Sequence, residues 1–172
     1  MIYPVYYYQT SYIHHLHITP AKLFTTMKHL VLDNGSYTIK AGYAGGKLPK
    51  PQKTHNVIVR LKDGIIHTAN DYLAHLNQYL GMVFKRPHEQ GNLNQWEVER
   101  PIWDVVFERL KVQPAETQLT LTETAFQLPQ LLISTDQIVF EEYGLSEYFR
   151  CVPASLVPWT VGKVKQDDLD ME

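Results

Sequence analysis

The sequence predicts one α/β domain in which a mixed sheet carries flanking helices. Short β-type segments bounded by glycine, asparagine and aspartate alternate with stretches whose apolar residues recur at helical spacing. The chain has 172 residues, of which 44% are hydrophobic, so one core of ordinary size can be buried. The predicted order is three strands, two helices, a strand, a helix and a last strand.

The first strands are predicted to form a hairpin. HLVLDN is an apolar run that ends in the turn residues Asp33–Gly35, and YTIKAGY resumes after Ser36. Residues 56–61 read as another strand, followed by a turn at Lys62–Gly64. Residues 65–67 are then expected to return antiparallel to that strand.

Helical spacing follows in two stretches. Leucines recur at spacings of three and four over residues 70–80, which predicts a first helix. A loop from Lys85 leads into a second helix, with Asn94 as N-cap and Glu97 completing a capping box. Pro101 removes an intrahelical hydrogen bond, so we expect a kink there or a later helix start. The apolar stripe of this helix comprises Trp96, Ile102, Trp103, Val106, Phe107 and Leu110.

The remaining predicted elements are a strand over residues 118–123, a helix over 131–143 and a strand over 148–152. Pro153 fits the first position of a further helix on geometric grounds.

Composition excludes several classes of function. Sixteen Lys and Arg against 18 Asp and Glu give a net charge of -2, which provides no basic field for charge-driven nucleic-acid binding. No apolar run reaches the roughly 18 residues of a membrane span, so we expect no membrane association. The single cysteine, Cys151, cannot form an internal disulfide.

Both ends of the chain differ from its centre. Residues 1–27 are rich in tyrosine and histidine and are interpreted as a disordered extension or as a gene-model artefact, with Met27 as the natural start. A metal site at His14, His15 and His17 is the weaker interpretation, because no carboxylate or thiolate partner stands at helical spacing. Residues 161–172 are interpreted as an acidic, solvated tail or a truncation end.

The turn of the first hairpin can also carry chemistry. Gly35 lets the chain turn closely and present backbone N–H groups to a phosphate, and Ser36 adds a hydroxyl donor. Lys40 can reach a β- or γ-phosphate, and Asp33 can hold a divalent ion through water. Ordinary turn chemistry explains every one of these residues except Lys40, so the structural interpretation stays open.

A resemblance to a known family covers nearly all of the chain after residue 28. HLVLDNGSYTIKAGYAG resembles the first phosphate loop of the actin family. NVIVR, KRPHEQGNLNQWEVERPIWDVVF and LTLTE…QIVFEEY follow in the order of that family and near its spacing. The stretch TETAFQLPQLLISTDQIVFEEYGLSEYFRCVPASLVPW is most similar to the actin-related protein 6 branch, whose members carry a comparable FEEY and PASL pairing.

The resemblance implies an actin-like, ribonuclease-H-like N-terminal lobe over residues 28–160, with the second lobe absent. It implies that Asp33 faces a nucleotide-bound magnesium ion, that Asn34, Gly35, Ser36 and Tyr37 line the phosphates of ATP, and that Lys40 contacts them. With one lobe absent, ATP binding is expected to be weak or lost. Apolar helix faces around Trp103 and Phe140 are expected to be exposed.

The resemblance also implies a function. Where actins place the glutamine that orients the attacking water, this chain has Pro153, which has no side-chain donor, so no catalytic residue is assigned. We expect a non-hydrolysing, architectural subunit of a nuclear ATP-dependent chromatin-remodelling complex for variant-histone exchange, also found in the cytoplasm. Its expected partners are other subunits of the complex, with histones as a further candidate. The alternatives are an actin-like ATPase or cytoskeletal filament protein, and a non-functional truncated fragment.

Overall fold

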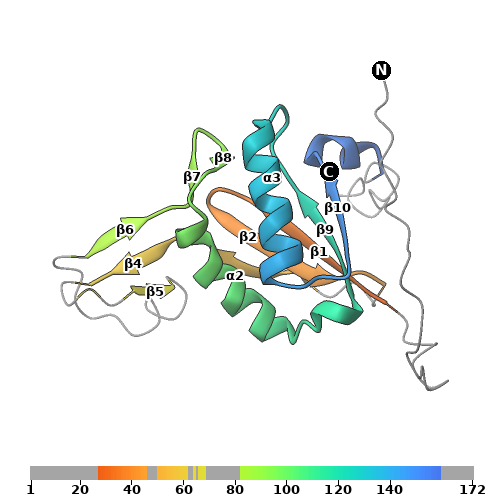
Figure 1. The fold of residues 1–172 in the computed structure, drawn as a ribbon, viewed down its shortest axis with the longest axis horizontal. Coiled ribbons are helices and arrows are strands. Elements are labelled where there is room, and N and C mark those ends of the chain that lie inside the picture. The colour runs from red at the N-terminus through yellow and green to blue at the C-terminus, as the bar shows by residue number, and fades with distance from the viewer. Residues whose placement is uncertain (1–26, 46–49, 62–63, 65, 69–81, 160–172) are drawn as a thin grey trace, which may run out of the picture.

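The computed structural model describes residues 27–45, 50–61, 64, 66–68 and 82–159. The predicted extension before Met27, the helix over 70–80 and the acidic tail therefore lie outside the described residues. The central feature is a five-stranded mixed sheet with the order β10-β9-β1-β2-β3 (Figure 1). Its strands are β1 (Lys28–Asn34), β2 (Thr38–Tyr43), β3 (Gln52–His55), β9 (Thr117–Thr122) and β10 (Glu147–Cys151).

The pairing within this sheet joins a local hairpin to distant strands. β1 pairs antiparallel with β2, which confirms the predicted hairpin, and β3 extends it on the other side of β2. β1 also pairs in parallel with β9, and β9 pairs in parallel with β10. The sheet is therefore parallel on one side of β1 and antiparallel on the other, which confirms the predicted mixed α/β architecture.

One face of this sheet forms the core. Alternate residues of the strands point to it, and Leu30, Leu32 and Leu121 are each at most 1% exposed. The helices α2 (Trp96–Leu110) and α3 (Pro129–Gln137) lie on the same face (Figure 1). Trp103 of α2 and Val139, from the turn that continues α3, belong to the core cluster. The alternate apolar side chains of the strands and those of the α2 stripe thus pack together in one cluster.

Helix α2 differs from its prediction at the N-terminus. The N-cap is Gln95 and no side chain caps the helix, so the predicted capping box is wrong. Asn94 instead donates from Nδ2 to Glu89 Oε2 at 2.9 Å. The helix begins at Trp96 with Pro101 inside it, so the later start is also wrong. Burial of the stripe on both sides of Pro101 compensates for the missing hydrogen bond.

The third predicted helix starts earlier and ends differently. α3 begins at Pro129, where proline suits the first turn, and continues as the π-helical turn η3 (Ile138–Glu142). Trp103 is fully buried against this region, so its predicted exposure is wrong, whereas Phe140 is 47% exposed. The aromatic rings of Trp103 and Tyr143 lie 5.7 Å apart, and this packing closes the α2 face.

Smaller elements surround the main sheet. β4 (Ile58–Arg60) pairs antiparallel with β5 (Ile66–Thr68), as predicted, and with β6 (Val83–Lys85). The predicted loop before α2 contains the hairpin of β7 (His88–Glu89) and β8 (Asn92–Leu93). The 3₁₀ helices η2 and η4 cover Pro114–Glu116 and Pro153–Trp159.

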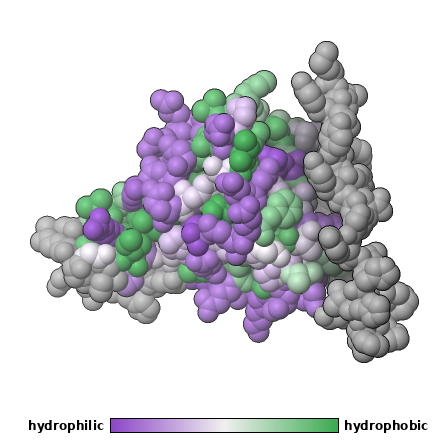
Figure 2. Space-filling model, in the orientation of Figure 1, coloured by the Kyte–Doolittle hydropathy of each residue, from purple (hydrophilic) through white to green (hydrophobic). Residues whose placement is uncertain are grey.

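The surface mixes polar and apolar side chains. Ile66, Val83 and Phe84 of the three-stranded sheet are exposed, and Figure 2 shows apolar surface over these strands. Within the part of the chain that the structure describes, no helix is long and apolar enough to cross a membrane.

Candidate functional site

The carboxyl ends of the three parallel strands meet at one edge of the sheet. Asp33 of β1 lies opposite Thr122 of β9, and Thr122 lies opposite Cys151 of β10. The residues that follow these positions, Glu123 and Pro153 among them, therefore gather at the same edge. Ligands of open α/β sheets bind outside this end of the strands, so the register places Asp33 where a ligand is expected.

The β1–β2 hairpin brings Asp33 and Lys40 together. Lys40 Nζ donates to Asp33 Oδ2 at 2.7 Å, and Thr122 Oγ1 donates to Asp33 Oδ1 at 2.7 Å. Burial alone would raise the pKa of Asp33, but the hydrogen bonds from Lys40 and Thr122 outweigh burial and lower it. Asp33 is thus a carboxylate at neutral pH. Both side chains of the ion pair stay partly exposed, at 46% for Lys40 and 35% for Asp33.

The turn between β1 and β2 exposes its outer residues. Ser36 and Tyr37 are exposed, and Asn34 and Gly35 are partly buried. A Cβ atom on Gly35 would lie 2.7 Å from the backbone oxygen of Thr38, so only glycine fits there. The exposed Ser36 hydroxyl and the half-exposed Lys40 ammonium are the donors that a phosphate group prefers.

Arg86 fixes the outer side of this turn, and sequence analysis missed it. Arg86 Nη1 donates to the backbone oxygens of Ser36 and Asn56 at 3.3 Å each. Its guanidinium also lies 4.5 Å from the centre of the Tyr37 ring, within cation–π range. Arg86 precedes the β7–β8 hairpin, which was predicted as loop, so the sequence pattern gave no reason to place it near the turn.

A buried polar cluster supports the turn from the core side. Asn56 Nδ2 donates to the backbone oxygen of Gly35 at 3.1 Å, and Trp103 Nε1 donates to Asn34 Oδ1 at 3.3 Å. Both side chains also donate to Glu99 Oε1, at 3.3 Å from Asn56 and 2.9 Å from Trp103. Burial raises the pKa of Glu99 to about 7, although hydrogen bonds from Asn56, Asn34 and Trp103 oppose the rise.

His88 completes this cluster. Its Nδ1 lies 3.5 Å from Asn56 Nδ2, and burial lowers its pKa to about 4, so the ring is neutral near pH 7. Sequence analysis found neither Glu99 nor His88, because a glutamate within a helix and a histidine within a loop are ordinarily solvated.

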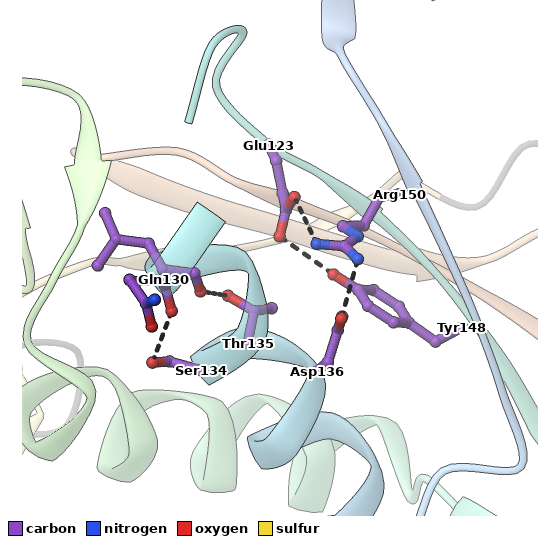
Figure 3. A network of polar contacts seen from close by, with 8 residues as sticks. Glu123, Gln130, Ser134, Thr135, Asp136, Tyr148 and Arg150 are labelled. Atoms are coloured by element: carbon purple, nitrogen blue, oxygen red, sulfur yellow. Dashed lines mark hydrogen bonds and ion pairs between the residues drawn. The ribbon is translucent and has the colours of Figure 1, made fainter. Parts of the chain in front are cut away.

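A second polar network lies at the ends of β9 and β10 (Figure 3). Arg150 Nη2 lies 3.0 Å from Asp136 Oδ2, and Arg150 Nη1 lies 4.0 Å from Glu123 Oε2. Tyr148 donates from its hydroxyl to Glu123 Oε1 at 3.1 Å. Burial raises the pKa of Glu123 and of Asp136, against the opposing effect of Arg150.

This network borders a groove of about 360 Å³ that Phe126, Leu132 and Val152 also line. Residues after β9, Leu132 of α3 and the end of β10 build it together, so no single local pattern gave a signal for it. Pro153 begins η4 and is exposed, as expected of a proline at the first position of a helix.

The donor set fits a magnesium nucleotide. Magnesium takes one or two carboxylates together with phosphate oxygens and water, and Asp33 offers one carboxylate beside the Ser36 and Lys40 donors. Among the described residues, no three His, Cys, Asp or Glu side chains cluster as a metal site. His14, His15 and His17 lie outside these residues.

The actin family profile matches residues 25–166 of this chain. The chain belongs to the actin family. The family prediction is therefore confirmed, and the mixed sheet with its helices is an actin-like lobe. Actin-family proteins bind ATP, which agrees with a phosphate-binding interpretation of the turn.

Relatives within the actin family support the predicted branch. The chain is 50% identical over 139 residues to the actin-like protein ARP6 of Debaryomyces hansenii, covering 78% of this chain and 34% of the relative. It is 43% identical over 166 residues to the actin-like protein ARP6 of Candida albicans, covering 78% and 37%. It is 39% identical over 137 residues to actin-related protein 6 of Neurospora crassa, covering 76% and 30%. The chain thus spans about a third of the length of these relatives.

Proposed function

We propose that this chain supplies the nucleotide-facing lobe of an actin-related protein that serves as a non-hydrolysing, architectural subunit of a nuclear chromatin-remodelling complex. The variant-histone exchange, the nuclear and cytoplasmic location, and the partners, namely other subunits and histones, are parts of the same proposal. The similarity to relatives named ARP6 supports it, together with what the resemblance to that branch implies.

The observation that carries the nucleotide part is the ion pair of Asp33 and Lys40 at the carboxyl edge of the parallel strands. Asp33 is held ionised by Lys40 and Thr122, and Lys40 keeps 46% of its side chain exposed. The carboxylate of Asp33 can hold magnesium through water. The exposed part of the Lys40 ammonium can contact a phosphate directly. The chain's own residues here bind and orient a nucleotide.

The observation that carries the non-hydrolysing part is Pro153. Its ring nitrogen has no hydrogen and its side chain has no polar atom, so it cannot orient an attacking water. The test is ATP turnover by the purified chain and by P153Q. We expect no turnover above background for the unmodified chain. Turnover at an actin-like rate with Pro153 in place would support the ATPase alternative instead.

Nucleotide binding is tested by thermal unfolding with and without MgATP. Binding to the native state raises the midpoint, by an amount that grows with ligand concentration. We expect a cooperative transition that shifts upward at millimolar MgATP, as weak binding requires, and does not shift with magnesium alone. A transition that stays in place at millimolar MgATP would contradict nucleotide binding.

The complex is tested by affinity purification of the tagged chain from nuclei of its own organism. We expect a remodelling ATPase and its subunits to co-purify, and a histone variant in the same fractions. Recovery with cytoskeletal filaments and without remodelling subunits would favour the filament alternative.

A further inference from the structure

We infer that Glu99 is a positioning residue for the Asp33–Tyr37 turn, which it holds from the core side through Asn34, Asn56 and Trp103, and that its ionisation weakens anion binding there. The inference rests on the proposed function insofar as the anion is a nucleotide phosphate. The positioning itself does not depend on the ligand.

The contacts form two short paths from Glu99 to the turn. In the first, Asn56 Nδ2 lies 3.3 Å from Glu99 Oε1 and 3.1 Å from the backbone oxygen of Gly35. In the second, Trp103 Nε1 lies 2.9 Å from Glu99 Oε1 and 3.3 Å from Asn34 Oδ1. One carboxyl oxygen therefore organises donors that hold both Asn34 and Gly35.

Glu99 sits in an environment that favours its neutral form. It is 0% exposed, and the side chains that hydrogen-bond to it, those of Asn56, Asn34 and Trp103, are neutral donors. Its second oxygen, Oε2, has no hydrogen-bond partner among the described residues, and neither has Asn56 Oδ1. A buried carboxylate with one unsatisfied oxygen costs more than a buried carboxylic acid, so a proton is retained to unusually high pH.

Among the described residues, the charged groups that lie around the cluster do not neutralise an ionised Glu99. His88 faces Asn56 from β7, and burial keeps it neutral near pH 7. Arg86 reaches the same asparagine from the end of β6, but it bonds to backbone oxygens on the outer side of the turn. On β1, Asp33 is paired with Lys40. Ionisation of Glu99 thus adds an uncompensated negative charge behind a turn that receives phosphate.

Binding and protonation are then linked. If an anion at the turn favours neutral Glu99, affinity must fall as the pH rises through the pKa of Glu99. Burial raises that pKa to about 7. A glutamine at this position keeps the shape and the acceptor oxygen but carries no charge at any pH.

The experiment follows the amide ¹H–¹⁵N signals of Gly35 and Ser36 from pH 5 to pH 9 without ligand, in the full chain and in E99Q. We expect both signals to titrate with a midpoint near 7 in the unmodified chain and to stay constant in E99Q. E97Q is the matched control, because Glu97 lies on the same helix with a 69% exposed side chain. It should titrate as the unmodified chain does.

A second variant keeps the test decisive if E99Q does not fold. W103F retains a large ring but removes the indole donor, whose hydrogen bond lowers the pKa of Glu99. We expect the titration midpoint of Gly35 to move upward in W103F. An unchanged midpoint in W103F, a flat response in the unmodified chain, or the same titration in E99Q would overturn the inference.

MgATP binding at pH 6 and pH 8 separates this inference from the proposed function. We expect affinity to fall at least threefold from pH 6 to pH 8 in the unmodified chain and in E97Q, and to change less in E99Q. Ionisation of the ligand itself is common to all three proteins and cancels in the comparison. If no protein binds MgATP while the amide titration persists, nucleotide binding fails and the positioning role stands.

Discussion

At the scale of single residues, Asp33 shows how a partly exposed carboxylate is kept ready for a ligand. Each of its oxygens accepts one hydrogen bond, from Lys40 and from Thr122, at 2.7 Å. Each oxygen keeps a further lone pair, so the carboxylate can still accept water from a metal hydration shell. The pair is exposed enough that its contribution to stability is small.

Substitution K40M separates binding from stability. We expect the free energy of unfolding to change by less than about 1 kcal/mol, as for exposed ion pairs, and MgATP affinity to fall at least about tenfold. Urea denaturation and calorimetric titration measure the two effects. K53M is the matched control, because Lys53 lies opposite Lys40 on β3 and is exposed. Equal affinity loss in K53M would indicate general electrostatics rather than a specific contact.

The pH dependence of stability is a second prediction for single residues. The pKa of Glu99 rises from 4.5 to about 7 on folding. The contribution of Glu99 to the free energy of unfolding is therefore complete below pH 4.5 and is lost as the pH rises through about 7. At about 1.4 kcal/mol per unit this loss is about 3 kcal/mol. The pKa of His88 falls from 6.5 to about 4, so its contribution is complete above pH 6.5 and is lost on acidification.

In the unmodified chain, the contribution of Glu99 is lost as the pH rises and that of His88 is lost as the pH falls. In E99Q only the contribution of His88 remains. We expect the stability of E99Q relative to the unmodified chain to increase from pH 5 to pH 8. Urea denaturation at each pH measures it, with E97Q as the control that follows the unmodified chain. A constant difference between E99Q and the unmodified chain would show that Glu99 is already ionised at pH 5.

At the scale of elements, the tight turn between β1 and β2 depends on Gly35. A Cβ there would lie 2.7 Å from a backbone oxygen that cannot move without disturbing β2. We expect G35A to destabilise the chain by about 1–3 kcal/mol, as overpacking does. G42A is the matched control, since its Cβ would meet the nearest atom of Pro51 at 3.8 Å. Thermal unfolding of both variants checks this, and equal destabilisation would contradict the steric argument.

The elements also show what local sequence predicts and what it does not. The β1–β2 hairpin and the stripe of α2 were predictable, because residues close in the sequence determine both. The start of α2 was not, because Asn94 and Gln95 both donate to Glu89 of the β7–β8 hairpin. A side-chain contact with the preceding hairpin thus took the place of the cap.

At the scale of the whole molecule, the family motifs predicted the lobe and the turn residues, and the supporting residues came only from the structure. Asn56 follows β3, His88 lies on β7 and Glu99 on α2, and their importance follows from burial rather than from spacing. The same holds for Arg150, whose partners are Glu123, which follows β9, and Asp136 of α3. Motif analysis points to the residues of the turn and misses the buried residues behind them.

Amide hydrogen exchange of the folded chain should follow the sheet order. β1 and β9 have neighbours on both sides, whereas β3 and β10 are edge strands. We expect the slowest exchange at Leu30 and Leu119, both at most 1% exposed, and faster exchange in β3. Protection of β3 equal to that of β1 would indicate that something else covers this edge.

The parallel pairing of β1 has a consequence for synthesis on the ribosome. β1 and β2 can pair as soon as both have emerged, but Thr122 follows its partner Asp33 by 89 residues. At a synthesis rate of about 5–20 residues per second, the second edge of β1 stays unpaired for several seconds. A strand edge open for that time is a site for aggregation, so chaperone binding to the nascent chain should be strongest between the emergence of β2 and that of β9.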